Sequence, residues 1–187
     1  MNRNHVTIST ALVFLFAGAV GAADAKDAKT KTRSFQESFS GSYVNAGTQS
    51  LNMLGVNSTL LGESTLQRVD QFGAPVPGSC PNGDAGLIFT LVPGTGHGVA
   101  RNTATGALIF QQDTSSTVCL DLTNGIYYFS GAGVITGGTG RFAGATGSYT
   151  FKGSATDLYR DAAGNFFGEQ SGTDEGAITI LSTGEKD

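Results

Sequence analysis

The segment Gly137–Gly147 reads GGTGRFAGATG, and five of its eleven residues are glycine. Glycine has no Cβ and adopts left-handed backbone conformations at little steric cost, so Gly-Gly and Thr-Gly pairs mark tight turns and bulges. Strand-like sequence precedes the segment at Ile126–Thr136 and follows it at Ser148–Lys152. We therefore expect a strand-turn-strand unit. In it Phe142 plugs a barrel end or a core edge, and Arg141 points to solvent or holds loop carbonyls.

Glycine-rich segments also occur in nucleotide-binding loops, which is the alternative for this one. Those loops aim a helix N-terminus at the phosphate, and the P-loop carries a lysine followed by serine or threonine. The sequence after Gly147 is strand-like, and the segment has no such lysine. The segment therefore indicates architecture rather than phosphate binding.

The rest of the chain reads as short strands separated by turns, with no convincing helix. Phe35–Tyr43 alternates between apolar and polar residues, as a strand with one buried face does. Thr59–Phe72 is expected to be one long strand, and Gly73–Gly86 a turn-rich loop. Asn124-Gly125, between LDL and IYYF, is typical of a two-residue hairpin turn.

Glycine recurs inside the expected strands, where it weakens a flat sheet but permits the sharp coiling of a small closed barrel. The positions are Gly131, Gly133, Gly153, Gly168, Gly172 and Gly176. With the glycine-rich turn, this pattern predicts one all-β domain over residues 35–181. We expect a single antiparallel, eight-stranded, closed β-barrel of the calycin-like kind.

Ile135–Gly147 (ITGGTGRFAGATG) resembles the strand-turn-strand signature of the allene oxide cyclase and dirigent barrel superfamily. Bacterial secreted members of that superfamily carry closely similar segments. The resemblance covers these thirteen residues and implies the barrel fold, with active-site residues on the barrel interior and mostly on other strands. No local motif carries those residues across one by one. The family's cyclase or dirigent activity therefore stays an option that the resemblance allows.

Residues 1–23 have the organisation of a secretory signal peptide. Arg3 supplies the positive start, Ile8–Val20 the apolar core, and Gly21-Ala22-Ala23 the small residues before cleavage. The apolar core is shorter than the roughly 20 residues of a membrane span, although an uncleaved anchor is the alternative. We predict a secreted or periplasmic protein with no membrane span after cleavage. Residues 24–34 are expected to be a flexible linker and residues 182–187 a C-terminal tail.

The charge balance excludes one class of partner. Without residues 1–23 the chain has 10 basic and 15 acidic residues, and the basic ones are scattered. Nucleic acids need clustered cations, so no nucleic-acid partner is expected.

Cys80 and Cys119 are the only cysteines, and an even pair in an exported protein predicts a disulfide. It would tie the Pro75–Asn82 loop to the strand Ser116–Leu122 and contribute roughly 3–4 kcal/mol by loop closure. There is no CxxC motif, and His97 is the only histidine after residue 23. The sequence therefore predicts neither a metal site nor a cofactor.

Four charged residues are candidates for chemistry inside the barrel. Glu37 shares a strand face with apolar residues, where burial would raise its pKa and suit it to acid–base chemistry. The other interpretation places Glu37 at the rim in water. Arg68 and Asp70 share one face and form either an interior ion pair or an exposed edge. Asp157 is a secondary inward candidate.

Aromatic side chains are the candidate ligand contacts, because an eight-stranded barrel has room for side chains or one small molecule. We expect Tyr127 and Tyr128 to point to opposite sides, so that one of them supplies an interior hydroxyl. The predicted ligand contacts are Phe35, Phe39, Tyr43 and Tyr128.

Two functions fit these residues. The first is an exported barrel that binds a small apolar molecule, and the resemblance extends this to a cofactor-free cyclase, isomerase or dirigent-like steering activity. The second is a non-catalytic extracellular barrel with a structural or surface-interaction role. An open interior containing Glu37 or Arg68 favours the first, and an interior filled by Phe, Leu and Ile favours the second.

Overall fold

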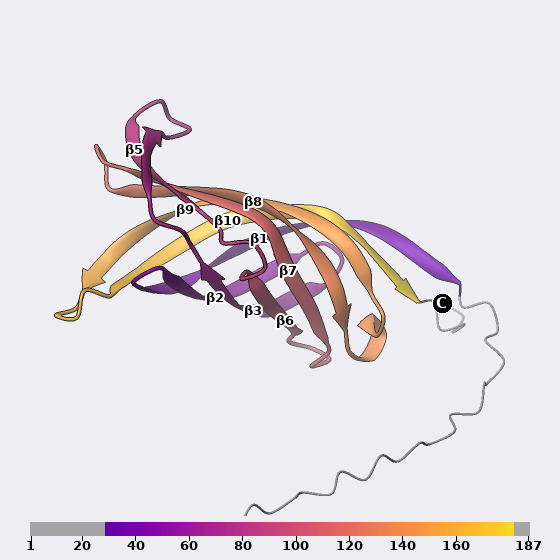
Figure 1. The fold of residues 1–187 in the computed structure, drawn as a ribbon. Coiled ribbons are helices and arrows are strands. Elements are labelled where there is room, and N and C mark those ends of the chain that lie inside the picture. The colour runs from indigo at the N-terminus through magenta and orange to yellow at the C-terminus, as the bar shows by residue number, and fades with distance from the viewer. Residues whose placement is uncertain (1–28, 182–187) are drawn as a thin grey trace, which may run out of the picture.

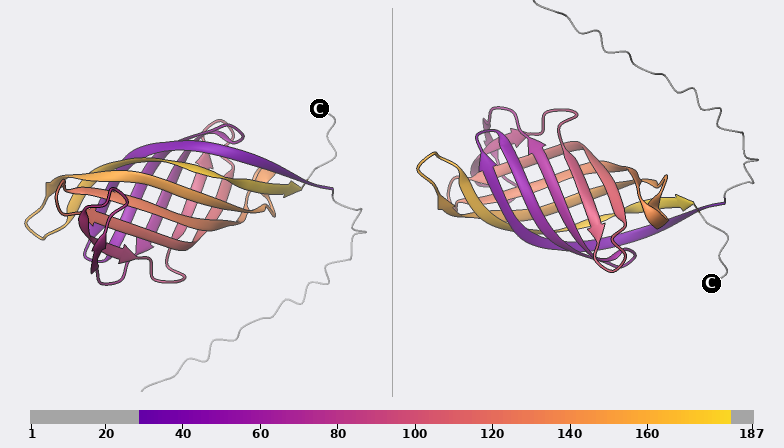
Figure 2. Two further views of the ribbon diagram at one scale, coloured as in Figure 1. Left: turned by 90° about the horizontal axis from the view of Figure 1, so that it is seen from above. Right: turned by 90° about the horizontal axis from the view of Figure 1, so that it is seen from below.

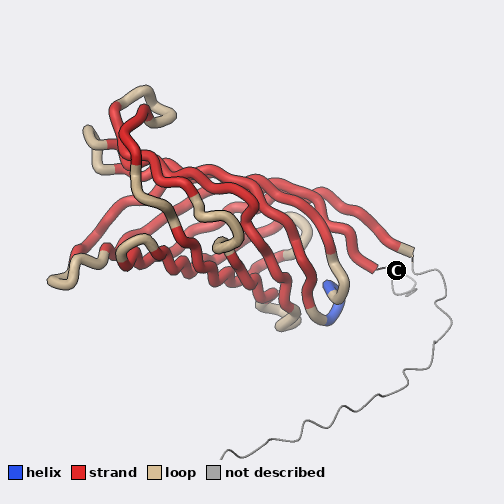
Figure 3. Tube along the Cα trace, in the orientation of Figure 1, coloured by secondary structure: helices blue, strands red, loops and turns tan. Residues whose placement is uncertain are grey.

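The computed structural model describes residues 29–181, which form ten β-strands and one short 3-10 helix, η1. Figures 1 and 3 show that strands make up nearly all of this part of the chain. The elements in chain order are β1 (Thr30–Ala46), β2 (Gln49–Ser58), β3 (Gly62–Gln71), β4 (Val76–Ser79), β5 (Ala85–Thr90), β6 (His97–Asn102), β7 (Leu108–Asp121), β8 (Ile126–Gly138), η1 (Gly140–Phe142), β9 (Thr146–Arg160) and β10 (Phe166–Leu181).

Eight of the strands close into an antiparallel barrel, which confirms the predicted fold (Figure 2). The order around the barrel is β7-β6-β3-β2-β1-β10-β9-β8, and β8 pairs back onto β7. β4 and β5 form an additional hairpin. β5 pairs with the second half of β7 along the edge whose first half pairs with β6.

The interior glycines have a more specific role than coiling the sheet. Phe35, Phe39 and Tyr43 on β1 lie directly opposite Gly176, Gly172 and Gly168 on β10. A Cβ added to Gly172 would lie 2.5 Å from Cζ of Phe39, and one added to Gly176 would lie 2.9 Å from Cζ of Phe35. Each glycine therefore leaves free the space on the inner face of the sheet that the ring from the neighbouring strand occupies.

The same pairing recurs between β8 and β9. Phe151 and Tyr149 on β9 lie opposite Gly131 and Gly133 on β8, and Phe129 on β8 lies opposite Gly153 on β9. The rings of Phe39, Phe129 and Phe151 follow one another at centroid distances of 6.1 and 6.5 Å. Half of the barrel wall is thus built from paired aromatic residues and glycines.

The glycine-rich segment closes one end of the barrel. It contains η1, which Figure 3 shows as the one short helical turn, and Phe142 is only 2% exposed there. Phe142 belongs to an apolar cluster with Phe35, Ile109, Ile135, Ala145 and Ile178. Arg141 is exposed, with its guanidinium 4.7 Å from the Phe142 ring centroid. We call this the closed end; the predicted plug and the predicted exposure of Arg141 are confirmed.

Some boundaries differ from the sequence prediction. β1 begins at Thr30 and pairs with the end of β10 from Leu181 onward, so the last part of the expected linker lies in the sheet. Pairing of two strands needs no buried apolar side chain there, and the Thr32 and Thr179 hydroxyls bond at 2.7 Å. The predicted strand Thr59–Phe72 begins only at Gly62, and the predicted loop Gly73–Gly86 contains β4. The signal peptide and C-terminal tail predictions fall outside the described residues.

Candidate functional site

A cavity of about 260 Å³ occupies the end of the barrel opposite Phe142. Its mouth lies at the β1–β2 turn, around Gly47 and Thr48, and the segment Phe72–Pro75 forms another part of it. We call this the open end. Most of the exposed wall is apolar, and six of the rings that line it are Phe39, Tyr43, Tyr127, Phe129, Phe151 and Phe166.

A chain of hydrogen bonds and ion pairs crosses the barrel interior at the base of this cavity. The Gln170 amide donates to Asn52 at 2.6 Å, and the Asn52 amide donates to Asp70 at 3.1 Å. Arg68 joins Asp70 to Asp113, which accepts the Tyr149 hydroxyl at 2.7 Å. We call these six residues the polar belt: Gln170, Asn52, Asp70, Arg68, Asp113 and Tyr149.

Arg68 is the centre of the polar belt. Its Nε lies 3.1 Å from Asp70, its Nη2 pairs with Asp113, and its guanidinium carbon lies 4.4 Å from the Phe151 ring centroid. Burial raises the pKa of Asp70, although the Arg68 charge and the Asn52 amide act in the opposite direction. Of the two predicted arrangements for Arg68 and Asp70, the structure shows the interior ion pair.

Glu37 and Asp174 form a pair of carboxyl groups beside the polar belt. They are direct partners in the register of β1 and β10, and both are 8% exposed. Burial raises the pKa of Glu37, as the sequence predicted for an inward position. Burial and the Glu37 charge raise the pKa of Asp174 to about 7, while Arg68 acts to lower it. One oxygen of Asp174, Oδ1, has no hydrogen-bond partner among the described residues.

Asp157 lies at the rim of the open end and is exposed. It accepts the Tyr43 hydroxyl at 2.6 Å and the Tyr127 hydroxyl at 2.9 Å. Burial and the hydrogen bond to Asp157 raise the pKa of both tyrosines. Both hydroxyls therefore stay protonated at neutral pH and face each other across one carboxylate.

The predicted ligand contacts divide into two groups. Phe39 and Tyr43 line the cavity, whereas Phe35 does not line it and packs in the apolar core with Phe142. Tyr127 lines the cavity and Tyr128 does not, so the predicted contact at Tyr128 is wrong and the inward ring is that of Tyr127. Its hydroxyl lies at the rim, on Asp157, and not deep in the interior. The sequence could not choose between them, because both neighbours are tyrosine and either phase of β8 buries one ring.

Several interior polar residues were missed by the sequence analysis: Asn52, Asp113, Gln170 and Asp174. On β10 the inward positions alternate as Gly168, Gln170, Gly172 and Asp174, opposite the aromatic face of β1. The outward residues Glu169 and Glu175 are exposed. The available signal was the alternation of glycine itself, since each inward glycine implies a large partner on the next strand.

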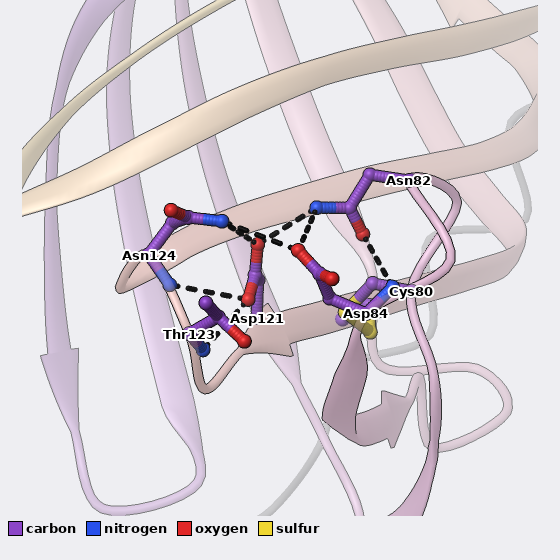
Figure 4. The surroundings of a disulfide bond; sticks show 7 residues. Cys80, Asn82, Asp84, Asp121, Thr123 and Asn124 are labelled. Carbon is purple, nitrogen blue, oxygen red and sulfur yellow. Dashed lines mark hydrogen bonds between the residues drawn. A yellow bond between two sulfur atoms is a disulfide. The ribbon is translucent and has the colours of Figure 1, made fainter.

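The disulfide between Cys80 and Cys119 is present and fastens the β4–β5 hairpin to β7. Figure 4 shows the cluster beside it, in which the carboxylate of Asp121 accepts the Asn82 and Asn124 amides at 2.8 Å each. These amides and the Thr123 and Asn124 backbone N–H groups lower the pKa of Asp121 to about 2. Phe89 of β5 lines the cavity, so the hairpin helps to build the open end. Disulfides are typical of proteins from oxidising compartments.

Within residues 29–181 no group of three or more metal-ligating side chains is placed to hold an ion. The same residues include no helix long and apolar enough to cross a membrane.

Comparison with known proteins gives one structural likeness. No family model matches the sequence, and no curated protein sequence matches it. Among solved structures, a pterocarpan synthase dirigent protein is similar with 14% sequence identity and a TM-score of 0.36, covering 85% of this chain and 90% of that one. At this level of likeness no residue role passes from that protein to this chain. The Ile135–Gly147 resemblance predicted a closed antiparallel barrel. The evidence for that barrel in this chain is the strand pairing, and not the structural likeness.

Proposed function

We propose that this protein is an exported binding protein that holds a small, largely apolar molecule in the open end of its barrel. The observation that carries this is the cavity of about 260 Å³, which has aromatic walls and a charged base. Binding sites for small molecules are typically concave and mostly apolar, with a few convergent polar groups. The volume lies below the roughly 300–1,000 Å³ of sites for drug-sized ligands. A ligand with one or two rings therefore suits it.

The predicted discriminating feature supports this function over a filled barrel. Arg68 and Asp174 both line the cavity, whereas the closed end is filled by apolar side chains. The predicted signal peptide and the disulfide support export. The buried carboxyl groups of Glu37 and Asp174 have raised pKa values and are suited to proton transfer. This agrees with the cofactor-free activity that the resemblance allows, but binding is the function for which the geometry argues.

Filling the cavity tests the proposal. Ala155 lines the cavity, and Ala155→Phe would occupy it with a ring. Leu158→Phe is the matched control, because Leu158 is 68% exposed. Native mass spectrometry and thermal shift with a panel of small aromatic alcohols and ketones are expected to show ligands bound to the wild type and to Leu158→Phe. Equal binding by Ala155→Phe would contradict the proposal.

The outer wall provides an observation in favour of the second function. Leu51 pairs across the sheet with Val69, Val99 pairs with Phe110, and all four are exposed by 36–47%. An apolar row of this kind across β2, β3, β6 and β7 suits a surface interaction. If the Val69→Lys variant no longer bound a protein partner but still bound the small ligand as the wild type does, the two functions would be separate.

A further inference from the structure

We propose that the cavity selects a cationic ligand, a protonated amine on a small apolar body, and that Asp174 receives the charged group. This inference rests on the proposed binding function and names the chemical class of its ligand. Three features of the interior favour such a ligand: the balance of buried charge, the unpartnered oxygen of Asp174, and the aromatic walls.

The buried charges of the interior are predominantly acidic. Among the residues that the structure describes, Arg68 is the one basic side chain lining the cavity, and it already pairs with Asp70 and Asp113. Glu37 and Asp174 remain, both buried and neither in an ion pair among the described residues. A carboxylate ligand would meet an arginine whose charge is already compensated, together with further acidic groups. The interior therefore disfavours an anion and favours a positive charge.

Asp174 is the buried carboxyl group that can accept a further hydrogen bond. It is 92% buried, it lines the cavity, and its Oδ1 has no hydrogen-bond partner among residues 29–181. Leaving a buried polar atom unpaired costs free energy. The position of Glu37 directly opposite Asp174 on β1 adds a second cost, because two like charges repel. An ammonium group at Asp174 would supply the missing donor and would reduce the repulsion between the two carboxyl groups.

The walls of the cavity suit the same ligand. A cation is attracted to the face of an aromatic ring, most strongly where water is excluded. Phe151 already holds the Arg68 guanidinium in this way and also lies beside Asp174 in the cavity lining. Phe39, Phe129 and Tyr127 offer further rings for the apolar body. A neutral alcohol could donate to Asp174, but it would leave the charge imbalance in place.

Three probes of nearly equal shape separate these possibilities: 2-phenylethylamine, 2-phenylethanol and phenylacetate. Titration calorimetry at pH 7.5 is expected to show the amine binding at least about tenfold more tightly than the alcohol, which corresponds to about 1.4 kcal/mol. Phenylacetate is expected to bind most weakly. In Asp174→Asn the affinity for the amine should fall to that for the alcohol, while the affinity for the alcohol should stay unchanged. Glu175→Gln is the matched control, because it removes a carboxylate from the exposed neighbour.

Proton release provides a second readout. A cation at Asp174 favours its ionised form, so amine binding near pH 7 should release protons in the wild type and not in Asp174→Asn. The titratable groups of the interior are Glu37 on β1, Arg68 and Asp70 on β3, Asp113 on β7 and Tyr149 on β9, and His97 on β6 acts on Asp70 from the exposed side. Buffers of different ionisation enthalpy measure the release.

The outcomes separate the two proposals. Alcohol or phenylacetate binding as tightly as the amine overturns the selection of a cation and leaves the binding function standing. An unchanged amine preference in Asp174→Asn overturns the role of Asp174. Failure of all three probes, together with failure of the neutral panel, overturns both the binding function and its ligand class.

Discussion

The two ends of this barrel are built from the same eight strands, but one interior is apolar and the other is charged. The closed end is apolar and filled, with Phe142 and Ile178 almost inaccessible to solvent. The open end holds a cavity above the polar belt, with one arginine among several carboxyl groups. An eight-stranded barrel has an interior that side chains can just fill. Apolar packing at one end can therefore provide the stability that a charged, hollow other end does not.

The largest expected effect comes from breaking the closed end. Phe142→Ala removes a ring that is 2% exposed and should lower the free energy of unfolding by about 3–5 kcal/mol. Urea denaturation followed by circular dichroism measures it. Phe167→Ala is the control, since Phe167 is 37% exposed and should cost less than about 1 kcal/mol. Similar losses in the two variants would contradict the view that the closed end carries the stability.

A smaller effect is expected at Gly172, in the wall that β1 and β10 form between the two ends. In Gly172→Ala the new methyl group would lie against the Phe39 ring and the Lys152 carbonyl, and overpacking of this kind costs about 1–3 kcal/mol. Gly55→Ala is the matched control, because its methyl group would meet only the Ser40 carbonyl oxygen, at 3.8 Å. Thermal unfolding of both variants measures the difference. A neutral Gly172→Ala would show that the ring does not need the space.

The smallest effect concerns the charged end and pH. The pKa of Asp174 is about 7 in the folded protein against an ordinary value of 3.8, so the folded state binds its proton more tightly. The stability that this provides is complete below pH 3.8 and is lost as the pH rises through 7. Glu37 and Asp70 shift in the same direction, whereas Asp121, with its pKa lowered to about 2, affects stability only in acid.

We therefore expect the wild type to be less stable at pH 8 than at pH 5. Since one pKa unit corresponds to about 1.4 kcal/mol, Asp174→Asn should be more stable than the wild type at pH 8 by at least about 1 kcal/mol. Denaturation at several pH values tests this, with Glu175→Gln as the control. An Asn variant that is less stable at pH 8 would show that the carboxylate is well accommodated.

The fold could be predicted from the sequence because its signals are local. The alternation from Phe35 to Tyr43 identified the inward face of β1, and the Gly137–Gly147 turn identified the barrel. The disulfide followed from there being two cysteines in a chain that we expected to be exported. The same alternation left Glu37 either inward or at the rim, and the structure shows the buried position.

The site could be predicted only in part because its signals are not local. Asp174 lies on a strand face of glycines that has no hydrophobic pattern of its own, and the ring that fills the space at Gly172 comes from Phe39, far away in the chain. Asp113 enters the polar belt beside a β-bulge in β7, which the alternation of residues does not reveal. The preference for Tyr127 over Tyr128 depends on the register of β8 with β9.

The pairing of Thr30 with Leu181 has a practical consequence for immobilisation. Both ends of the described chain leave the barrel side by side, from the long ribbon beyond the closed end (Figure 2). A biosensor surface, a fusion partner or a bead attached at Thr30 or Leu181 would lie beyond the closed end, with the mouth directed away from the support. The cavity would stay accessible to dissolved compounds, and the protein could be displayed as an oriented capture layer.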